Sequence, residues 1–207
     1  SAMAHDVLGA TFDIHGGGND LQFPHHENEI AQSCCAYPES EFARYWLHNE
    51  MLQVDGKKMS KSLGNFFTVR DLLDQGYPGE VIRFVFLSTH YNKPMDWNNS
   101  KALEAKNILR KWRILLKNNS EIVPIPEEVI NTLSDDLNTS GVISLLHKYA
   151  SNGEIGKLKA SANFLGILTD ELSEWCADVD LSSLEELFTD LRKRAIDSKN
   201  FGNVDEL

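Results

Sequence analysis

The chain has 207 residues, and its hydrophobic content of 42% is ordinary for a globular protein. Its formal net charge of −11 argues against a protein that wraps nucleic acid over its whole surface. No apolar run approaches the roughly 20 residues of a membrane helix, and the first residues lack the features of a secretory signal. We therefore expect no membrane contact, and because the three cysteines make no disulfide framework, we expect a cytoplasmic protein.

Residues 1–97 mix short apolar runs with glycine, proline and aromatic residues, a pattern that favours an α/β fold. The small residues at 1–9 predict a helix. Residues 11–14 predict a strand that ends in a glycine turn at 16–18. Pro24 suits the first turn of the helix that follows.

A hairpin and two helices are expected next. Asp55 and Gly56 form the dipeptide that is typical of a tight hairpin turn, with β-prone residues before it. Thr68 is expected to cap a short helix that ends at Gly76. The next segment predicts a buried helical stripe at Val81, Ile82, Val85 and Phe86.

After Trp97 the apolar periodicity becomes helical almost throughout. Ser100 is expected to cap a long helix, whose apolar positions are Leu103, Ile108, Trp112 and Leu115. Four more helical segments follow, at 126–138, 139–151, 153–169 and 181–201. The expected fold is therefore an α/β portion, residues 1–97, followed by an all-α portion, residues 98–207.

One short basic segment interrupts an otherwise acidic chain. Residues 1–100 carry seven Lys and Arg against thirteen Asp and Glu, and residues 118–207 carry seven against seventeen. Residues 101–117 instead carry six against one. Such a helix is usually a solvated face, but a local contact with an anion or a nucleic acid stays open. Trp112 within it is expected in the core.

Lysine and serine residues gather directly after the expected hairpin, at Lys57, Lys58, Ser60, Lys61 and Ser62. A cationic loop of this kind suits oxygens that gain negative charge, as when a triphosphate is cleaved. A lysine-rich stretch is also common as a solvated loop, so composition leaves both interpretations open.

Residues 13–30 hold three glycines and two adjacent histidines. In an α/β fold, ligands lie at the carboxyl ends of strands, which is where the glycines fall. His25 and Glu29 stand at i and i+4, so they share one face of a helix and could bind one metal ion. His26 and Glu29 are an alternative pair, and an ordinary structural role for both histidines is the simpler interpretation.

Two strings in this sequence point to a known family. Residues 58–65, KMSKSLGN, contain letter for letter the signature loop of class I aminoacyl-tRNA synthetases. Residues 12–33, with FDIHGGG and FPHHENEIAQS, closely resemble the cysteinyl-tRNA synthetases. The resemblance covers essentially the whole chain. It implies that residues 1–97 are the second half of a Rossmann-like class I synthetase core, and that residues 98–207 are a DALR-like helical tRNA-binding bundle.

The resemblance also implies roles for residues in the signature loop. Lys58 and Lys61 would stabilise the leaving pyrophosphate, and Ser60 and Ser62 would donate supporting hydrogen bonds. These residues form the catalytic group, and Lys61 would also bind ATP.

In the glycine-rich stretch, the resemblance implies contacts with the amino acid and the nucleotide. His15 would lie beside the amino-acid pocket. Asp20 would accept hydrogen bonds from a ribose or from the substrate ammonium. The residues implied near the adenylate are Gly16, Gly17, Gly18 and Asp20.

The resemblance further implies that His25 and Glu29 are zinc ligands, together with two cysteines. Zinc is thiophilic, so it would favour the thiol of cysteine over the hydroxyl of serine. The family places one ligand cysteine immediately before Ser1 and the other far upstream. Cys34 and Cys35 match neither position, so we expect an incomplete zinc site in this chain.

The resemblance implies a parent enzyme that activates cysteine with ATP and Mg²⁺, transfers it to tRNA(Cys), and acts as a monomer. We expect this chain to be a C-terminal fragment, with the bundle truncated at its end, that does not charge tRNA by itself. Two alternatives stay open. One is a cysteine-activating ligase of mycothiol biosynthesis, and the other is a non-catalytic module that binds nucleotide or RNA.

Overall fold

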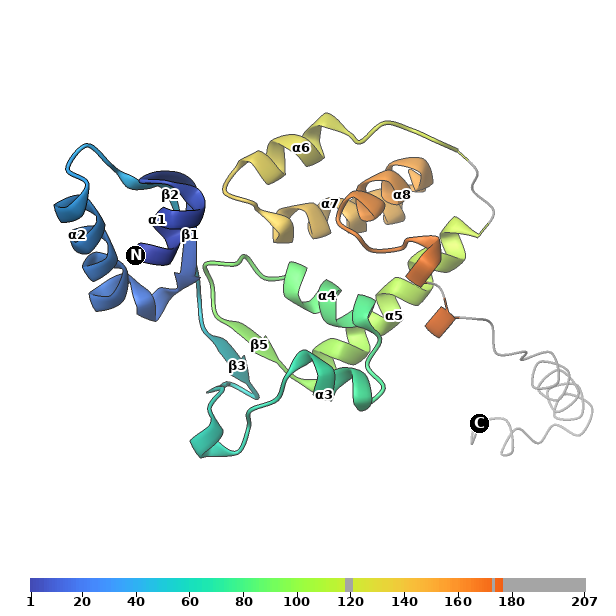
Figure 1. Ribbon diagram of the computed structural model, residues 1–207. Helices are drawn as coiled ribbons and strands as arrows, with labels where there is room; N and C mark the ends of the chain where they lie inside the picture. The colour runs from blue at the N-terminus through green and yellow to red at the C-terminus, as the bar shows by residue number, and fades with distance from the viewer. Residues whose placement is uncertain (118–120, 173, 177–207) are drawn as a thin grey trace, which may run out of the picture. The chain divides into compact units, whose positions relative to one another are not determined.

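The computed structural model describes residues 1–117, 121–172 and 174–176 (Figure 1). The chain divides into two compact units, Ser1–Leu172 and Ser173–Leu207. The helix expected at 181–201 lies outside the described residues. No helix of the described part is long and apolar enough to cross a membrane.

The N-terminal elements form a two-stranded parallel sheet with two helices. They are α1 (Ala2–Leu8), β1 (Thr11–Gly18), α2 (Glu27–Ala36) and β2 (Phe42–Asn49). The helix expected at the N-terminus is confirmed. The sheet is held by a small buried cluster of Phe12, Phe42 and Ala43, against which Ile30 and Trp46 pack.

The strand β1 is longer than the sequence indicated. It continues through Gly18, whose backbone pairs with Asn49 of β2, so the expected glycine turn at 16–18 is wrong. Glycine suits these extended positions because a side chain at Gly16 would meet the backbone of Leu47, and one at Gly17 would meet the ring of His26. Two short turns, η1 (Asn19–Leu21) and η2 (Gln22–His26), then lead into α2.

A second sheet has the strand order β4-β3-β5. Its strands are β3 (Leu52–Val54), β4 (Lys57–Lys58) and β5 (Met95–Trp97). The first two form the expected hairpin, with Asp55 and Gly56 at φ angles of 51° and 72°. Strand β5 pairs with β3 in parallel. The residues that follow β4 include the turn η3 (Lys61–Leu63).

The next two helices largely follow their predictions. Helix α3 (Val69–Asp74) has Thr68 as its N-cap, with a complete capping box to Asp71. In α4 (Gly79–Leu87) the buried positions are Glu80, Val81, Ile82, Phe84 and Val85. Phe86 is 43% exposed, so its place in the predicted buried stripe is wrong. The packed face of α4 includes Phe84 instead, which is buried.

Helix α5 (Asn99–Leu116) is long, as expected, but its cap and its buried face differ from the prediction. Asn98 is the N-cap, and its side chain accepts a hydrogen bond from the backbone N–H of Lys101, which corrects Ser100. The buried positions are Ala102, Ala105, Leu109 and Trp112. Leu103 is 60% exposed and Leu115 is also exposed, because the two alanines rather than the larger leucines form the packed stripe.

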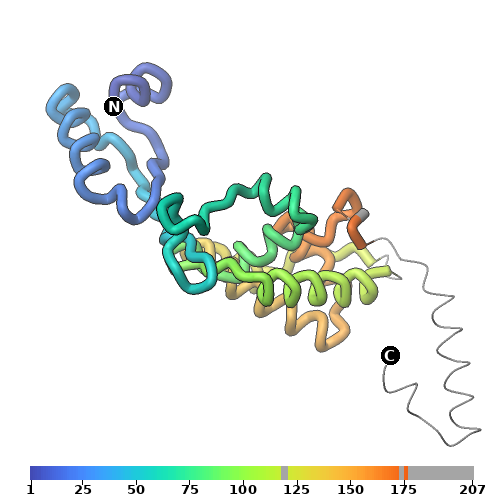
Figure 2. Tube along the Cα trace, turned by 90° about the horizontal axis from the view of Figure 1, so that it is seen from below, coloured from blue at the N-terminus to red at the C-terminus, as the bar shows by residue number. Residues whose placement is uncertain are grey.

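The remaining helices build a bundle. They are α6 (Glu127–Ser134), α7 (Thr139–Asn152) and α8 (Ile155–Phe164), in agreement with the three expected helical segments. Helix α5 packs against α4 and α8, and α7 packs against α4, α6 and α8 (Figures 1 and 2).

A buried ion pair ties α4 and α5 to the chain that follows α8. The Glu80 side chain is fully buried, and the Arg113 guanidinium donates to both of its oxygens at 2.8 and 2.9 Å. The backbone N–H of Leu168 donates to the same carboxylate. Arg113 also donates to the carbonyl oxygen of Thr169 at 3.3 Å. Arg113 is thus a structural residue and not part of a solvated basic face.

Candidate functional site

The glycines of β1 allow other groups to approach the strand closely. A Cβ atom on Gly17 would lie 2.9 Å from Cε1 of His26, and one on Gly16 would lie 3.2 Å from the carbonyl oxygen of Leu47. A Cβ on Gly18 would lie 2.5 Å from a carboxylate oxygen of Asp20. The close packing of His26, β2 and Asp20 therefore explains why residues 16–18 are glycines, without reference to a ligand.

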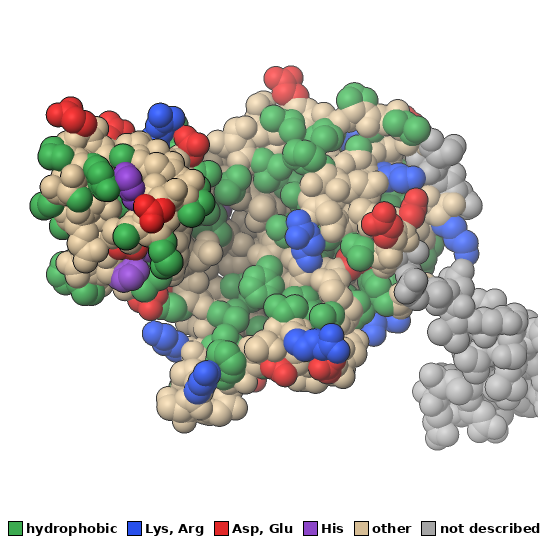
Figure 3. Space-filling view, viewed as in Figure 1, with side chains coloured by type: hydrophobic (Ala, Val, Ile, Leu, Met, Phe, Trp, Pro, Cys, Tyr) green, Lys and Arg blue, Asp and Glu red, His purple; other side chains and the backbone are tan. Residues whose placement is uncertain are grey.

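Histidine and glutamate side chains gather beside this end of β1. His15, His26 and Glu29 each bring a possible metal-ligand atom within 4.8 Å of the other two. Nε2 of His15 lies 3.1 Å from Oε2 of Glu29. On this part of the chain, histidine side chains also reach the surface next to acidic ones (Figure 3). The arrangement offers two imidazoles and one carboxylate to a cation.

His26 is the buried member of this group. Its Nδ1 lies 2.8 Å from Nε2 of His48, within hydrogen-bonding distance. Burial lowers the pKa of His26, and the neighbouring His15 and His48 lower it further. The neutral imidazole is thus favoured, which is the form that binds metals.

Glu29 stands at the centre of the predicted metal site. Its Oε2 atom is buried and makes no hydrogen bond of adequate geometry within the described structure, although His15 lies close. The Nε2 atom of His25 is 3.8 Å from the same oxygen, with the side chain 59% exposed. The backbone nitrogen of Ser1 lies 3.9 Å from Oε1. Ser1, His15 and His25, from three segments, therefore lie around one carboxylate, whose Oε2 atom is available to bind a cation.

Sequence reasoning found His15, His25 and Glu29 but gave no role to His48 and only an alternative one to His26. His48 faces His26 because β1 and β2 pair in parallel, with Gly17 opposite His48. No local spacing carries that information. The adjacency of His26 to His25 was a usable signal, but only the structure shows that the two rings differ in burial.

The signature loop, residues 58–62, lies on a different segment from the histidine group. It begins at Lys58, the last residue of β4, and its other residues follow the β3–β4 hairpin, where Lys/Arg side chains project from the surface (Figure 3). The Oγ atom of Ser60 accepts from the N–H of Leu63 and lies 3.3 Å from Oγ of Ser62. Nζ of Lys61 stands 5.4 Å from the centre of the Phe66 ring. Both serines are thus engaged in local hydrogen bonds.

Asn65 closes the signature loop from its far end. Its side-chain oxygen accepts from the N–H of Ser60 at 2.9 Å, and its amide donates to the carbonyl oxygen of Lys58 at 3.3 Å. Gly64 beside it has a φ of 68°, a conformation that favours glycine. One asparagine therefore holds the backbone on both sides of Met59. Sequence reasoning did not assign it a role.

At least two of the six basic side chains in the segment 101–117 are engaged in contacts within the protein. Arg113 is committed to Glu80, and Nζ of Lys101 donates to the backbone oxygen of Asp96 at 2.9 Å. Trp112 is 4% exposed and lies edge-on to Phe84, which confirms its expected place in the core.

Comparison with known proteins identifies the family of this chain. Residues 1–107 match the family described as "tRNA synthetases class I (C) catalytic domain". Two relatives named cysteine–tRNA ligase, from Ruegeria sp. (strain TM1040) and Paracoccus denitrificans (strain Pd 1222), are 62% and 60% identical over the whole chain. The chain spans 46% and 45% of their respective lengths.

A solved structure shows the same fold. The LeuRS chain in the ternary complex of Agrobacterium radiobacter K84 agnB2 LeuRS, tRNA and LeuAMS aligns with a TM-score of 0.54 and 19% sequence identity. The alignment covers 82% of this chain and 28% of that one. The family match alone covers more than half of the 207 residues. The chain therefore belongs to the class I (C) family of tRNA synthetase catalytic domains.

Proposed function

We propose that this chain is part of a cysteine–tRNA ligase that acts in the cytoplasm. The carrying observation is the match, over the whole of this chain, to four relatives of that name at 54–62% identity. The free cysteines Cys34, Cys35 and Cys176 agree with a reducing compartment. The proposed reaction has two steps, activation of cysteine by ATP and transfer to tRNA(Cys).

In the first step a carboxylate oxygen of cysteine attacks the α-phosphorus of ATP, and pyrophosphate leaves with the electron pair of the broken bond. Negative charge grows on the leaving oxygens, and Lys58 and Lys61 are the residues that we assign to its stabilisation. Their exposure leaves both ammonium groups available to a ligand. Ser60 and Ser62 would exchange their local hydrogen bonds for contacts with the phosphates. Mg²⁺ would accompany the ATP.

In the second step a hydroxyl of the terminal tRNA ribose attacks the carbonyl carbon of the adenylate, and AMP leaves. We assign the amino-acid side of the site to His15 and Asp20, and the adenylate side to Gly16, Gly17 and Gly18. Asp20 contacts Gly18 closely, which supports placing both at one edge of the site. Positioning and charge stabilisation are enough for this chemistry, so no general base is invoked.

We propose that Glu29 and His25 bind zinc, as the family resemblance implies, and that zinc would supply selectivity for a thiol over a hydroxyl. The buried, unsatisfied Oε2 atom of Glu29 fits a cation. His15 and His26 also lie close enough to Glu29 to bind the same ion, so they are alternatives to His25 as its imidazole ligand.

Zinc binding by the chain is expected to depend on Glu29. Glu29→Gln removes the carboxylate charge, so the zinc affinity should fall by about tenfold or more. Zinc content after dialysis and calorimetric titration measure it, with Glu27→Gln as the matched control on the same helix. His25→Gln and His26→Gln, compared in the same assay, decide which imidazole is the ligand. An unchanged affinity in Glu29→Gln would remove the metal assignment.

The overall function is tested by cysteine-dependent exchange of pyrophosphate into ATP, followed by charging of tRNA(Cys). Both are measured on this chain and on a protein of the relatives' length that contains it. We expect activity with the longer protein and none with the chain alone. A longer protein that activates cysteine but transfers it to an amino sugar and never to tRNA would reject the proposal.

A further inference from the structure

The signature loop is attached to the rest of the fold through a short hairpin, and one carboxylate from another strand contacts that hairpin. Oδ1 of Asp96, on β5, accepts a hydrogen bond of 2.8 Å from the backbone N–H of Gly56. Gly56 is the second residue of the hairpin turn, and Lys58 follows two residues later. The contact joins residues 40 positions apart in the chain.

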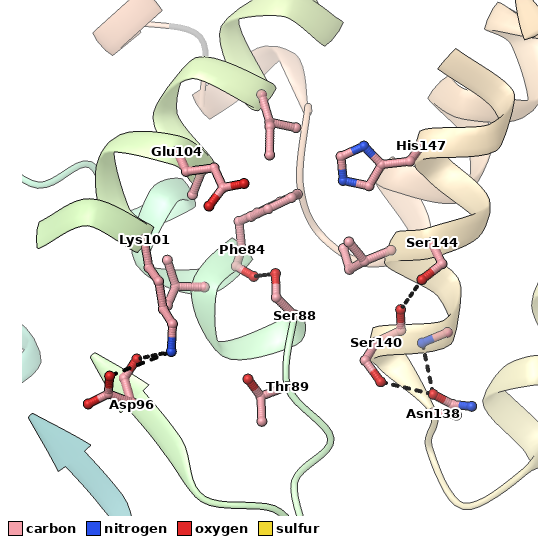
Figure 4. A pocket seen from close by; sticks show the side chains of 15 residues that line it. Phe84, Ser88, Thr89, Asp96, Lys101, Glu104, Asn138, Ser140, Ser144 and His147 are labelled. Carbon is pink, nitrogen blue, oxygen red and sulfur yellow. Dashed lines mark hydrogen bonds and ion pairs between the residues drawn. The ribbon is translucent and has the colours of Figure 1, made fainter. Parts of the chain in front are cut away.

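Asp96 is itself held in place from the other side. Its Oδ2 atom accepts a hydrogen bond of 3.0 Å from the side chain of Asn98, the residue that caps α5. Nζ of Lys101 donates to its backbone oxygen and lies 3.7 Å from Oδ2 (Figure 4). The hydrogen bond from Gly56 is the strongest influence that lowers the pKa of Asp96, with those from Asn98 and Lys101 also contributing. The carboxylate is therefore ionised and fixed in orientation.

The backbone around this contact aligns the hairpin with the same strand. Gln53 pairs with Asp96 and Val54 with Trp97 in the parallel ladder, and the N–H of Asp55 donates to the carbonyl oxygen of Trp97 at 3.2 Å. Beyond Asp55 the ladder ends. The hydrogen bond from Gly56 to Asp96 thus joins the hairpin turn itself to β5, one residue beyond the last backbone hydrogen bond of the ladder.

We propose that Asp96 is a positioning residue for the signature loop, which sets the direction in which the hairpin presents Lys58 and Lys61. This inference rests on the proposed function of those lysines. Asp96 touches no reacting atom, and acts through Gly56. A charge-assisted hydrogen bond to a backbone N–H is stronger than a neutral one, so a carboxylate at this place restrains a two-residue turn effectively.

The surroundings of Asp96 make it suitable for substitution. Its side chain is 24% exposed and borders an open cavity of about 680 Å³ between α4, α5 and α7, with Glu104 and His147 on facing sides (Figure 4). Removing the carboxylate therefore leaves no void in the core. The variant should stay folded, and any change at the loop should be local.

Limited trypsin digestion of the 207-residue chain tests the restraint without any assay of activity. In Asp96→Ala the initial rate of cutting after Lys57, Lys58 and Lys61 should rise about tenfold, because local opening controls cutting at a folded site. Asp96→Asn keeps an oxygen that accepts from Gly56 and should restore most of the protection. Asp74→Ala, which removes an exposed ion pair with Arg70, is the matched control and should leave these rates unchanged.

Cutting after Lys157 and Lys159 in α8 serves as the reference for global unfolding. An equal rise at α8 and at the loop, or no rise at the loop in Asp96→Ala, would overturn the proposal. So would a failure of Asp96→Asn to protect the loop better than Asp96→Ala.

The second measurement is cysteine-dependent pyrophosphate exchange in the longer, relative-length protein. Asp96→Ala should lower kcat by about tenfold, through misplacement of the lysines, and leave the KM for cysteine unchanged, because the proposed cysteine site lies on β1 and α2. A rise in that KM with kcat unchanged would contradict a positioning role. If the unmodified protein shows no exchange, the proposed function fails, whereas the digestion result still decides whether Asp96 restrains the loop.

Discussion

Replacing Arg113 with methionine is expected to lower the free energy of unfolding by about 3 to 5 kcal/mol, the range for breaking a buried ion pair from one side. The guanidinium faces both oxygens of Glu80, whose side chain is fully buried, and also donates to the carbonyl oxygen of Thr169. Methionine fills much of the same volume. The charge of Glu80 then stays in the interior without the guanidinium opposite it.

Urea denaturation followed by circular dichroism measures this loss. Arg44→Met is the matched control, because Arg44 pairs with Asp13 at 3.1 Å on an exposed surface and should cost no more than about 1 kcal/mol. The double variant Glu80→Gln with Arg113→Met removes the charge while an amide oxygen can still accept from Leu168. It should recover a large part of the loss. Equal losses for Arg113→Met and Arg44→Met would show that the pair contributes little.

Replacing Lys61 with alanine is expected to slow adenylate formation by about 100- to 1,000-fold, the usual effect of removing one stabilising group from a developing charge. Lys61 is exposed, and its only described ring contact is with Phe66 at 5.4 Å, so stability should barely change. Single-turnover formation of cysteinyl-adenylate in the relative-length protein measures the rate. The KM for cysteine should stay the same, because the charge appears only as the bond to pyrophosphate breaks.

Two further variants make the Lys61 result specific. Lys57→Ala removes an exposed lysine that lies outside the signature loop and should leave the rate within about twofold, because solvent and salt screen an exposed charge that does not contact the phosphates. Lys61→Arg keeps the charge but changes its shape and should recover only part of the rate. A loss in Lys61→Ala that is no larger than that in Lys57→Ala would refute the role given to Lys61.

Elements whose signals are local could be predicted from the sequence. Asp55 and Gly56 predicted the hairpin because few residues adopt left-handed φ angles readily, and Thr68 predicted the start of α3 because its hydroxyl satisfies a free backbone N–H. The buried face of α5 was predicted correctly at Trp112 but not at Leu103 and Leu115. Its contact surface is made by Ala102 and Ala105, whose small side chains give a weak hydrophobic signal beside Leu103.

The candidate site divides in the same way. His25 and Glu29 lie four residues apart, so their proximity follows from helical geometry, and the structure brings them within 3.8 Å. The contact between His26 and His48 depends on how two strands pair across 22 residues, which no local rule provides. The charge of Arg113 suggested a surface position, because its partner Glu80 lies 33 residues away and only the packed helices bring them together.

The parallel pairing of β1 and β2 has a consequence for how this protein tolerates insertions and deletions. Side chains alternate between the two faces of a strand, so one extra residue inside β2 would carry His48 to the opposite face of the sheet. The same extra residue between α2 and β2 would leave the alternation intact. Length variation in this part of the family should therefore collect before Phe42 and stop there, with Trp46 and His48 keeping a fixed distance from the start of the strand.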